Sequence, residues 1–155
     1  MLRKYKPVLI CVAIPLAVGG LAALLTRSGM DFYETVNKPP LSPPGWLFPV
    51  VWTILYVLMG VSSWLVWREK AAPGRRAALR VYAVQLAVNF LWTLLFFLAR
   101  RFLFSFVWLL LLAALILVML FRFDRISPRA AWLQMPYLLW SLFAAYLNLG
   151  VYLLN

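Results

Sequence analysis

The sequence predicts an all-α membrane protein, a bundle of five transmembrane helices. Of its 155 residues, 66% are hydrophobic and the mean hydropathy is +0.91, whereas a soluble domain is about 45–50% apolar. The apolar residues form continuous runs, and roughly 20 of them cross a bilayer core as a helix. Because lipid offers backbone N–H and C=O groups no partners, each run must satisfy these groups internally. A membrane barrel would instead alternate apolar and polar residues.

Five apolar runs account for most of the chain, and we expect them to form helices at about 7–26, 46–67, 79–99, 102–121 and 130–153. The connecting loops are short except the first, 27–45. No internal repeat is visible, so residues 1–155 are expected to form a single domain. The first run follows basic residues, as in a signal peptide, but it exceeds the about 7–15 residues of a signal-peptide core and no cleavage site follows. We therefore expect it to be retained as a helix.

Basic residues dominate the loops, and 15 Lys and Arg against 4 Asp and Glu give a net charge of +11. If the runs alternate across the membrane, most of these cations lie on the side of the N-terminus: Arg3, Lys4, Lys6, Arg68, Lys70, Arg75, Arg76, Arg80, Arg122, Arg125 and Arg129. Cytoplasmic loops carry such an excess, so the N-terminus is expected inside and the C-terminus outside, in a bacterial cell membrane. No exposed basic face remains for nucleic acid, and we expect no such partner.

The first loop is rich in proline, which fixes φ and biases the preceding residue away from helix. Its second half, 38–46, is therefore expected to be stiff and extended. Before it, residues 30–37 are expected to form a short helical turn capped by Asp31, with Glu34 three residues later. The segment is either a shaped lid over a cavity in the bundle or a stiff connector, and composition leaves both interpretations open.

The usual chemical groups are scarce in the spans. No charged residue lies inside any of them, which argues against ion-coupled transport and against conventional acid–base catalysis. The chain has no histidine, four acidic residues and a single cysteine, Cys11, in an apolar run. These residues do not supply the ligand set of a usual metal site, and we expect no metal and no required cofactor.

Aromatic and amide side chains recur on one face of several runs. Residues spaced three or four apart share a helical face, and polar amides in lipid turn toward the bundle interior. The stripes are Trp52 and Tyr56 in 46–67, Gln85, Asn89, Trp92 and Phe96 in 79–99, and Trp140, Phe143, Ala144 and Asn148 in 130–153. They form either the wall of a ligand cavity or ordinary core packing. Trp46, Trp64 and Trp67 lie near span ends and suit an interfacial belt.

Three motifs in this pattern resemble those of the tryptophan-rich sensory protein family, also known as translocator proteins (TspO) or peripheral-type benzodiazepine receptors. The resemblance covers nearly the whole chain. The motifs are Lys38-Pro39-x-x-x-Pro43-Pro44-Gly45 followed by Trp52, then Gln85-x-x-x-Asn89-x-x-Trp92-x-x-x-Phe96-Phe97, and Trp132-x-x-x-Pro136-Tyr137-Leu138-x-Trp140-x-x-Phe143-Ala144-x-Tyr146-Leu147-Asn148.

The resemblance implies a homodimeric five-helix bundle with a pocket for flat aromatic ligands, such as protoporphyrin IX, haem and drugs of the benzodiazepine-site class. Such a protein would act as a sensor, regulator or scavenger of porphyrins. The pocket positions that the resemblance implies are Tyr33, Trp52, Gln85, Asn89, Trp140 and Ala144. The helical stripes add Trp92, Phe96, Phe143 and Asn148 to the predicted ligand-binding residues. The implied lid residues are Pro39, Pro43, Pro44 and Gly45.

Two alternatives to a porphyrin binder stay open. One is a light-dependent porphyrin-degrading enzyme, in which Trp52 and Trp140 would be the candidate catalytic residues; the other is a transporter of porphyrin or lipid. The chain also departs from the eukaryotic sterol-recognition stretch, because no basic residue follows Tyr152. A sterol site is therefore not expected there.

Overall fold

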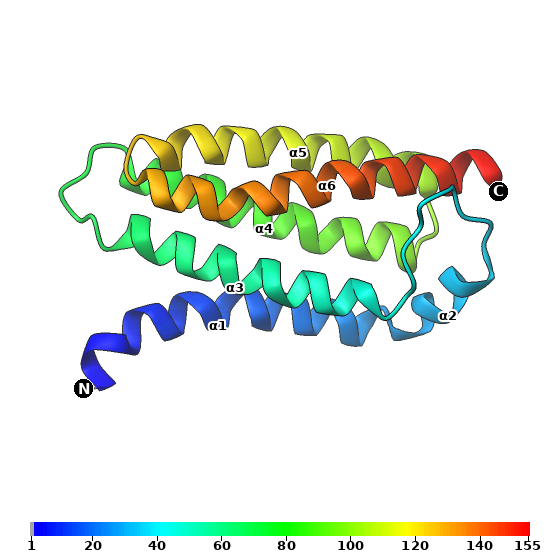
Figure 1. Ribbon diagram of the computed structural model, residues 1–155, viewed down its shortest axis with the longest axis horizontal. Helices are drawn as coiled ribbons and strands as arrows, with labels where there is room; N and C mark the ends of the chain where they lie inside the picture. Colours follow the sequence, from blue (N-terminus) through cyan, green and yellow to red (C-terminus); the bar gives the residue numbers. More distant parts are fainter. Residues whose placement is uncertain (1) are drawn as a thin grey trace.

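A computed structural model describes residues 2–155 of the chain (Figure 1). It is all-helical over these residues, with α1 (Leu2–Leu25), α2 (Arg27–Thr35), α3 (Leu47–Trp67), α4 (Arg75–Phe97), α5 (Phe102–Asp124) and α6 (Pro128–Leu154). All but α2 are long and apolar enough to cross a membrane. The prediction of an all-α bundle of five membrane-spanning helices is confirmed, and the chain is an integral membrane protein.

Four of the five long helices, α1, α4, α5 and α6, extend beyond the predicted apolar runs at the end that carries most of the basic residues. The first begins at Leu2 rather than at about residue 7, and α4 begins at Arg75 rather than at about 79. Gly74 precedes α4 with a φ of +79°, a conformation that glycine adopts without steric cost. The last helix begins at Pro128, which suits the first turn because its missing N–H would have no partner there. Helical geometry thus continues past the apolar runs, into the basic segments that flank them.

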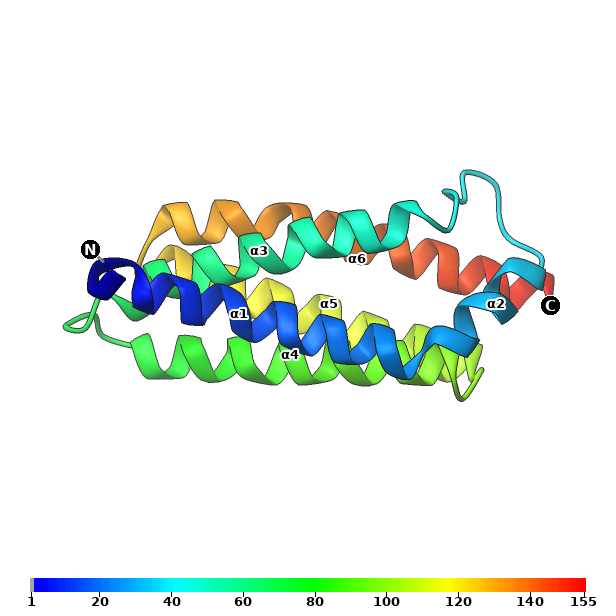
Figure 2. The ribbon, with the colours of Figure 1, turned by 90° about the horizontal axis from the view of Figure 1, so that it is seen from below.

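The five long helices run nearly along one axis (Figures 1 and 2). The most extensive packing joins α5 and α6; α3 packs against α1 and α6, and α4 packs against α5 and α1. The N-terminus lies at the same end as the α3–α4 and α5–α6 loops, and the C-terminus lies at the opposite end with α2 (Figure 1). We refer to these ends as the inner and the outer end.

Fully buried side chains fill the inner half of the bundle. Ser62 of α3 donates a hydrogen bond to the carbonyl oxygen of Ala130 on α6, at 2.7 Å. Six further residues of this half have no solvent-exposed surface: Met59, Val66, Ala78, Met119, Phe123 and Ala130. This half therefore resembles an ordinary close-packed core.

The first loop contains a helix, α2, that begins three residues before the predicted helical turn. The predicted turn at 30–37 is wrong at its start, because α2 begins at Arg27, and Asp31 lies inside it rather than at its cap. Thr26 precedes α2 with φ −109° and ψ 13°, and its hydroxyl donates to the carbonyl oxygen of Ala22 at 2.8 Å. A single residue therefore separates α1 from α2, and the new helix needs no acidic cap.

Candidate functional site

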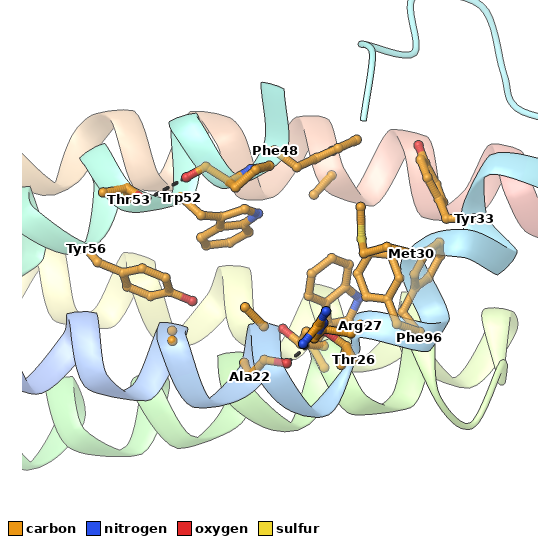
Figure 3. Close-up of a pocket in the computed structure, with 18 of the residues that line it drawn as sticks. Ala22, Thr26, Arg27, Met30, Tyr33, Phe48, Trp52, Thr53, Tyr56 and Phe96 are labelled. Carbon is orange, nitrogen blue, oxygen red and sulfur yellow. Dashed lines mark hydrogen bonds between the residues drawn. The ribbon is translucent and has the colours of Figure 1, made fainter. Parts of the chain in front are cut away.

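A cavity of about 580 Å³ opens between α1, α2, α3, α4 and α6 in the outer half of the bundle (Figure 3). Its volume lies within the about 300–1,000 Å³ that is usual for small-molecule sites. Its lining is mostly apolar and aromatic, with a few hydroxyl, amide and charged groups. The lining residues are Leu16, Gly19, Gly20, Ala22, Ala23, Thr26, Arg27, Ser28, Met30, Asp31, Tyr33, Phe48, Pro49, Trp52, Thr53, Tyr56, Trp92, Thr93, Phe96, Phe97, Trp140, Ala144, Leu147 and Asn148.

Trp52 of α3 lies at the centre of the aromatic wall. Its ring centroid is 5.6 Å from that of Tyr56 and 6.4 Å from that of Trp92 on α4. Tyr137 of α6 meets it edge-on at 6.2 Å. These separations lie within the range of favourable aromatic contacts. The indole is held from three helices and still borders the cavity, so it can offer its remaining surface to a flat ligand.

Trp140 of α6 forms another part of the wall. Its ring lies 6.0 Å from Phe48 of α3 and 5.5 Å from Phe143 on its own helix. Its Nε1 atom is buried and has no hydrogen-bond partner among residues 2–155. Ala144, one turn further along α6, also lines the cavity and leaves room beside the indole. Trp140 can therefore offer its ring to a ligand, whereas its unpaired N–H is buried away from the cavity surface.

Asn148 lines the cavity, but its own hydrogen bonds tie three helices together. Its Oδ1 accepts from Trp92 Nε1 at 3.0 Å and from Ser105 Oγ at 3.1 Å. Its Nδ2 donates to the carbonyl oxygen of Phe102 at 2.8 Å. The amide is therefore largely satisfied inside the protein, and its main effect is to fix the position of the Trp92 ring.

Gln85 and Asn89 are buried on the same face of α4, but neither lines the cavity. Gln85 Oε1 accepts a hydrogen bond from the Tyr137 hydroxyl at 2.7 Å. Both amide atoms of Asn89 lack a partner among residues 2–155. The predicted stripe on α4 thus extends from the cavity toward the inner end of the bundle, where Gln85 and Asn89 are polar residues of the core.

Most of the predicted ligand-binding residues gather at this one cavity: Tyr33, Trp52, Trp92, Phe96, Trp140, Ala144 and Asn148. Gln85, Asn89 and Phe143 do not line it, although Phe143 packs against Trp140. The binding roles of all ten stay predictions. The sequence reasoning missed the contribution of α1, whose small residues Gly19, Gly20, Ala22 and Ala23 border the space. Their grouping in one apolar run was the available signal.

The part of the first loop that borders the cavity is α2, through Tyr33 and its neighbours. The Tyr33 ring packs edge-on against Phe48 of α3 at 5.6 Å and against Phe97 of α4 at 5.9 Å. Lys38 Nζ lies 4.9 Å from the ring centroid. Burial raises the pKa of Tyr33 to about 12, and the negative charge of Glu34 adds to the effect. Tyr33 is thus a neutral side chain whose ring contacts hold α2 against α3 and α4 at the outer end.

None of the four predicted lid residues, Pro39, Pro43, Pro44 and Gly45, lines the cavity. The proline segment is instead fastened to the outer end of α6 by a set of contacts that we name the latch. In it, Pro39 packs against Gly150, and Tyr146 Oη donates to the Pro40 carbonyl oxygen at 2.7 Å. Asn155 exchanges two hydrogen bonds with the Asn37 backbone: its Nδ2 donates to the carbonyl oxygen at 2.8 Å, and its Oδ1 accepts from the N–H at 3.1 Å. The fourth hydrogen bond runs from Asn37 Nδ2 to the Leu154 carbonyl oxygen at 3.3 Å. A lid role for these prolines stays a prediction, and it would have to act through α2.

The chemistry that the site can perform is limited by its groups. Only two of its lining residues are charged, Arg27 and Asp31, and both lie on α2. Within residues 2–155, no three His, Cys, Asp or Glu side chains are grouped so that they could hold a metal ion. The arrangement suits binding of a flat apolar molecule by ring contacts, with a few polar groups to orient it.

Comparisons with known proteins cover the helices that build this cavity. Residues 11–154 match the model of the TspO/MBR family. The Translocator protein of Ovis aries is 37% identical over 151 residues, covering 96% of this chain and 89% of that protein. The Tryptophan-rich protein TspO of Chlorobaculum tepidum is 34% identical, covering 100% and 99%. The Tryptophan-rich sensory protein of Cereibacter sphaeroides is 34% identical, covering 81% and 77%.

Proposed function

The chain belongs to the TspO/MBR family, as the resemblance in its sequence indicated, and from this premise we propose that it binds porphyrins in the membrane and acts as their sensor, regulator or scavenger. Protoporphyrin IX and haem are the proposed ligands, and drugs of the benzodiazepine-site class would occupy the same cavity. Its relatives are named for translocation and for sensing. Binding is the step that either role requires.

One observation carries this proposal: the indoles of Trp52, Trp92 and Trp140, from three different helices, border one cavity. A porphyrin is a large flat π-system, and each aromatic pair contributes about 0.5–1.5 kcal/mol beyond the area that it buries. The apolar lining would favour the macrocycle, and lining hydroxyl groups such as those of Ser28 and Thr53 would give a polar edge partners. A small polar metabolite would leave most of this surface unused.

The test is a titration of the detergent-solubilised protein with protoporphyrin IX, followed by tryptophan quenching and by the porphyrin absorption band. Trp52→Ala and Trp140→Ala should each weaken binding about threefold to tenfold, since about 1.4 kcal/mol corresponds to tenfold. Trp→Phe keeps an aromatic face and should retain most of the affinity. Wild-type affinity in a protein lacking both indoles would contradict the proposal.

The matched control is Trp132→Ala, on the same helix as Trp140. Trp132 is 72% exposed and does not line the cavity. The Trp132→Ala substitution should therefore have little effect on the affinity for protoporphyrin IX or on the thermal stability. Equal losses at Trp132 and Trp140 would mean that tryptophans matter through the membrane surface of the protein rather than through the cavity.

The same variants separate a binder from a light-dependent enzyme. Two indoles on one cavity, Trp52 and Trp140, could take part in photochemistry of a bound porphyrin. Illuminated samples would then form a new product, absent in the dark, and Trp→Phe would abolish it while binding is retained, because phenylalanine is much harder to oxidise than indole. Absence of any product under light would leave binding as the function, and porphyrin flux into sealed vesicles would identify a transporter.

The orientation and the oligomeric state belong to the same proposal. The concentration of basic residues at the inner end supports a cytoplasmic N-terminus, with the cavity opening toward the outside of a bacterial cell. A C-terminal reporter that is active only in the cytoplasm would contradict this orientation. A homodimer is proposed on the family resemblance, and the protein mass measured by light scattering in detergent would test it.

A further inference from the structure

Arg27 is a solvent-exposed cation that lines the cavity, and within residues 2–155 no carboxylate lies within 4.0 Å of its guanidinium. It is the first residue of α2, it lines the cavity, and its nitrogens are drawn among the lining side chains in Figure 3. Within residues 2–155 its guanidinium makes no hydrogen bond, and the ion pair that the structure does contain joins Arg68 to Glu69 at the inner end. A guanidinium presents a planar fork of donors that matches a carboxylate.

The other cations of the outer end do not line this cavity. Lys38 lies over the Tyr33 ring and donates to the carbonyl oxygen of Glu34 at 3.3 Å. Arg100 lies over the Phe32 ring, 3.8 Å from its centroid. Arg101 borders a separate depression between the α4–α5 loop and the end of α6. Arg27 is therefore the one basic group that a ligand in the cavity can reach among the described residues.

Asp31 is the opposing charge at the cavity. It lies one helical turn after Arg27 on α2, and the two side chains do not form an ion pair within 4.0 Å. A ligand carboxylate near Arg27 would be attracted by the guanidinium and repelled, less strongly, by the more distant Asp31. Neutralising Arg27 should therefore weaken the binding of an anionic ligand, and neutralising Asp31 should strengthen it. Neither change should affect the binding of a neutral ligand.

We infer that Arg27 forms a carboxylate subsite, so that the cavity selects flat apolar ligands that carry an acidic group over neutral ligands of the same shape. This inference rests on the proposed function and narrows its ligand class. The ring system would lie against the indoles, and the acid would lie at the mouth against α2. The propionate groups of protoporphyrin IX meet this requirement, and its dimethyl ester does not.

The experiment compares protoporphyrin IX with its dimethyl ester, titrated into wild type, Arg27→Gln, Arg27→Lys and Asp31→Asn in a non-ionic detergent. For the acid, Arg27→Gln should raise Kd about threefold to fivefold, the range expected for one partly exposed charge pair. Arg27→Lys should recover most of the affinity, and Asp31→Asn should lower Kd about twofold. For the ester, every variant should stay within about twofold of wild type. The differences in Kd for the acid between wild type and the charge variants should shrink in high salt.

The matched control is Arg101→Gln, which removes the same charge from the same end outside the cavity. It should leave both Kd values unchanged. An equal loss for acid and ester in Arg27→Gln, no loss for either, or a loss of the same size in Arg101→Gln would overturn the carboxylate subsite. If wild type binds neither porphyrin, the proposed function itself fails, and this outcome is distinct from equal binding of acid and ester.

Discussion

The inner and outer halves of the bundle contrast in one respect: the inner half is filled and the outer half encloses a cavity. The seam between α1 and α3 shows the cause. At Gly60 of α3, an added Cβ would overlap the backbone of Cys11 and Val12 on α1, so the helices are in backbone contact. At Gly19 of α1, an added Cβ would meet the ring of Tyr56 instead.

The two glycines therefore do different things on one seam. Gly60 lets two backbones meet, as small residues do at helix interfaces in membranes. Gly19 makes room for a large ring that borders the cavity. On this seam, the glycine that faces backbone brings the two helices together, and the glycine that faces an aromatic side chain leaves room for that ring at the cavity.

The largest expected effect follows from Gly60→Ala. The added methyl group meets backbone, which has no alternative rotamer, so α1 must move away from α3. We expect a loss of about 1–3 kcal/mol, the usual cost of overpacking, measured as a lower midpoint of thermal unfolding in detergent. Gly20→Ala is the control, because nothing lies within 4 Å of its added Cβ. Equal stability of the two variants would show that the seam is looser than described.

The next effect separates affinity from stability. In Gly19→Ala the obstacle is the ring of Tyr56, a side chain that can turn into the cavity. We expect a change in unfolding free energy below about 1 kcal/mol, since the helix propensity gained by replacing glycine offsets part of the strain. Porphyrin affinity should fall severalfold, because the turned ring occupies ligand space. A large loss of stability with unchanged affinity would remove the distinction between the two halves.

A smaller effect is expected at the latch. Tyr146→Phe together with Asn155→Ala removes three of its four hydrogen bonds and leaves the one from Asn37 Nδ2 to the Leu154 carbonyl oxygen. Neither substituted residue lines the cavity. Freeing the segment should loosen α2 and speed porphyrin dissociation by about twofold to fivefold, because such changes act mainly on the off-rate. Stopped-flow displacement measures it. Pro43→Gly with Pro44→Gly should act in the same direction; wild-type off-rates in both variants would make the segment a connector only.

The smallest effect is expected for Trp64→Phe, at the inner end. Trp64 is half-buried, and the Arg68 guanidinium lies 4.8 Å from its ring centroid. Phenylalanine keeps the packing and part of the cation–π contact, so the unfolding free energy should change by less than about 0.5 kcal/mol. Porphyrin affinity should be unchanged, as a fluorescence titration would record. A weaker affinity would mean that the ligand reaches the inner half.

The sequence predicted which face of α3, α4 and α6 turns inward, but not how deep along the bundle each residue lies. Gln85 and Trp92 share a face of α4, yet only Trp92 borders the cavity. Gln85 lies nearer the inner end, where it accepts a hydrogen bond from the Tyr137 hydroxyl. Periodicity reports the angle around a helix axis. Depth depends on which neighbouring helix supplies a ring and which supplies a small residue, and that is a property of the packed bundle.

By itself, the sequence determined the membrane class, the five spans and the inward faces of three of them, because local hydrophobicity and helical period decide these features one segment at a time. Only the tertiary structure decided that α1 contributes to the cavity, that α2 begins at Arg27 and borders it, and that the prolines fasten to α6. Each of these depends on contacts between distant parts of the chain, such as Pro39 with Gly150 and Gly19 with Tyr56. Such contacts are fixed by shape complementarity between whole helices, and no local pattern encodes it.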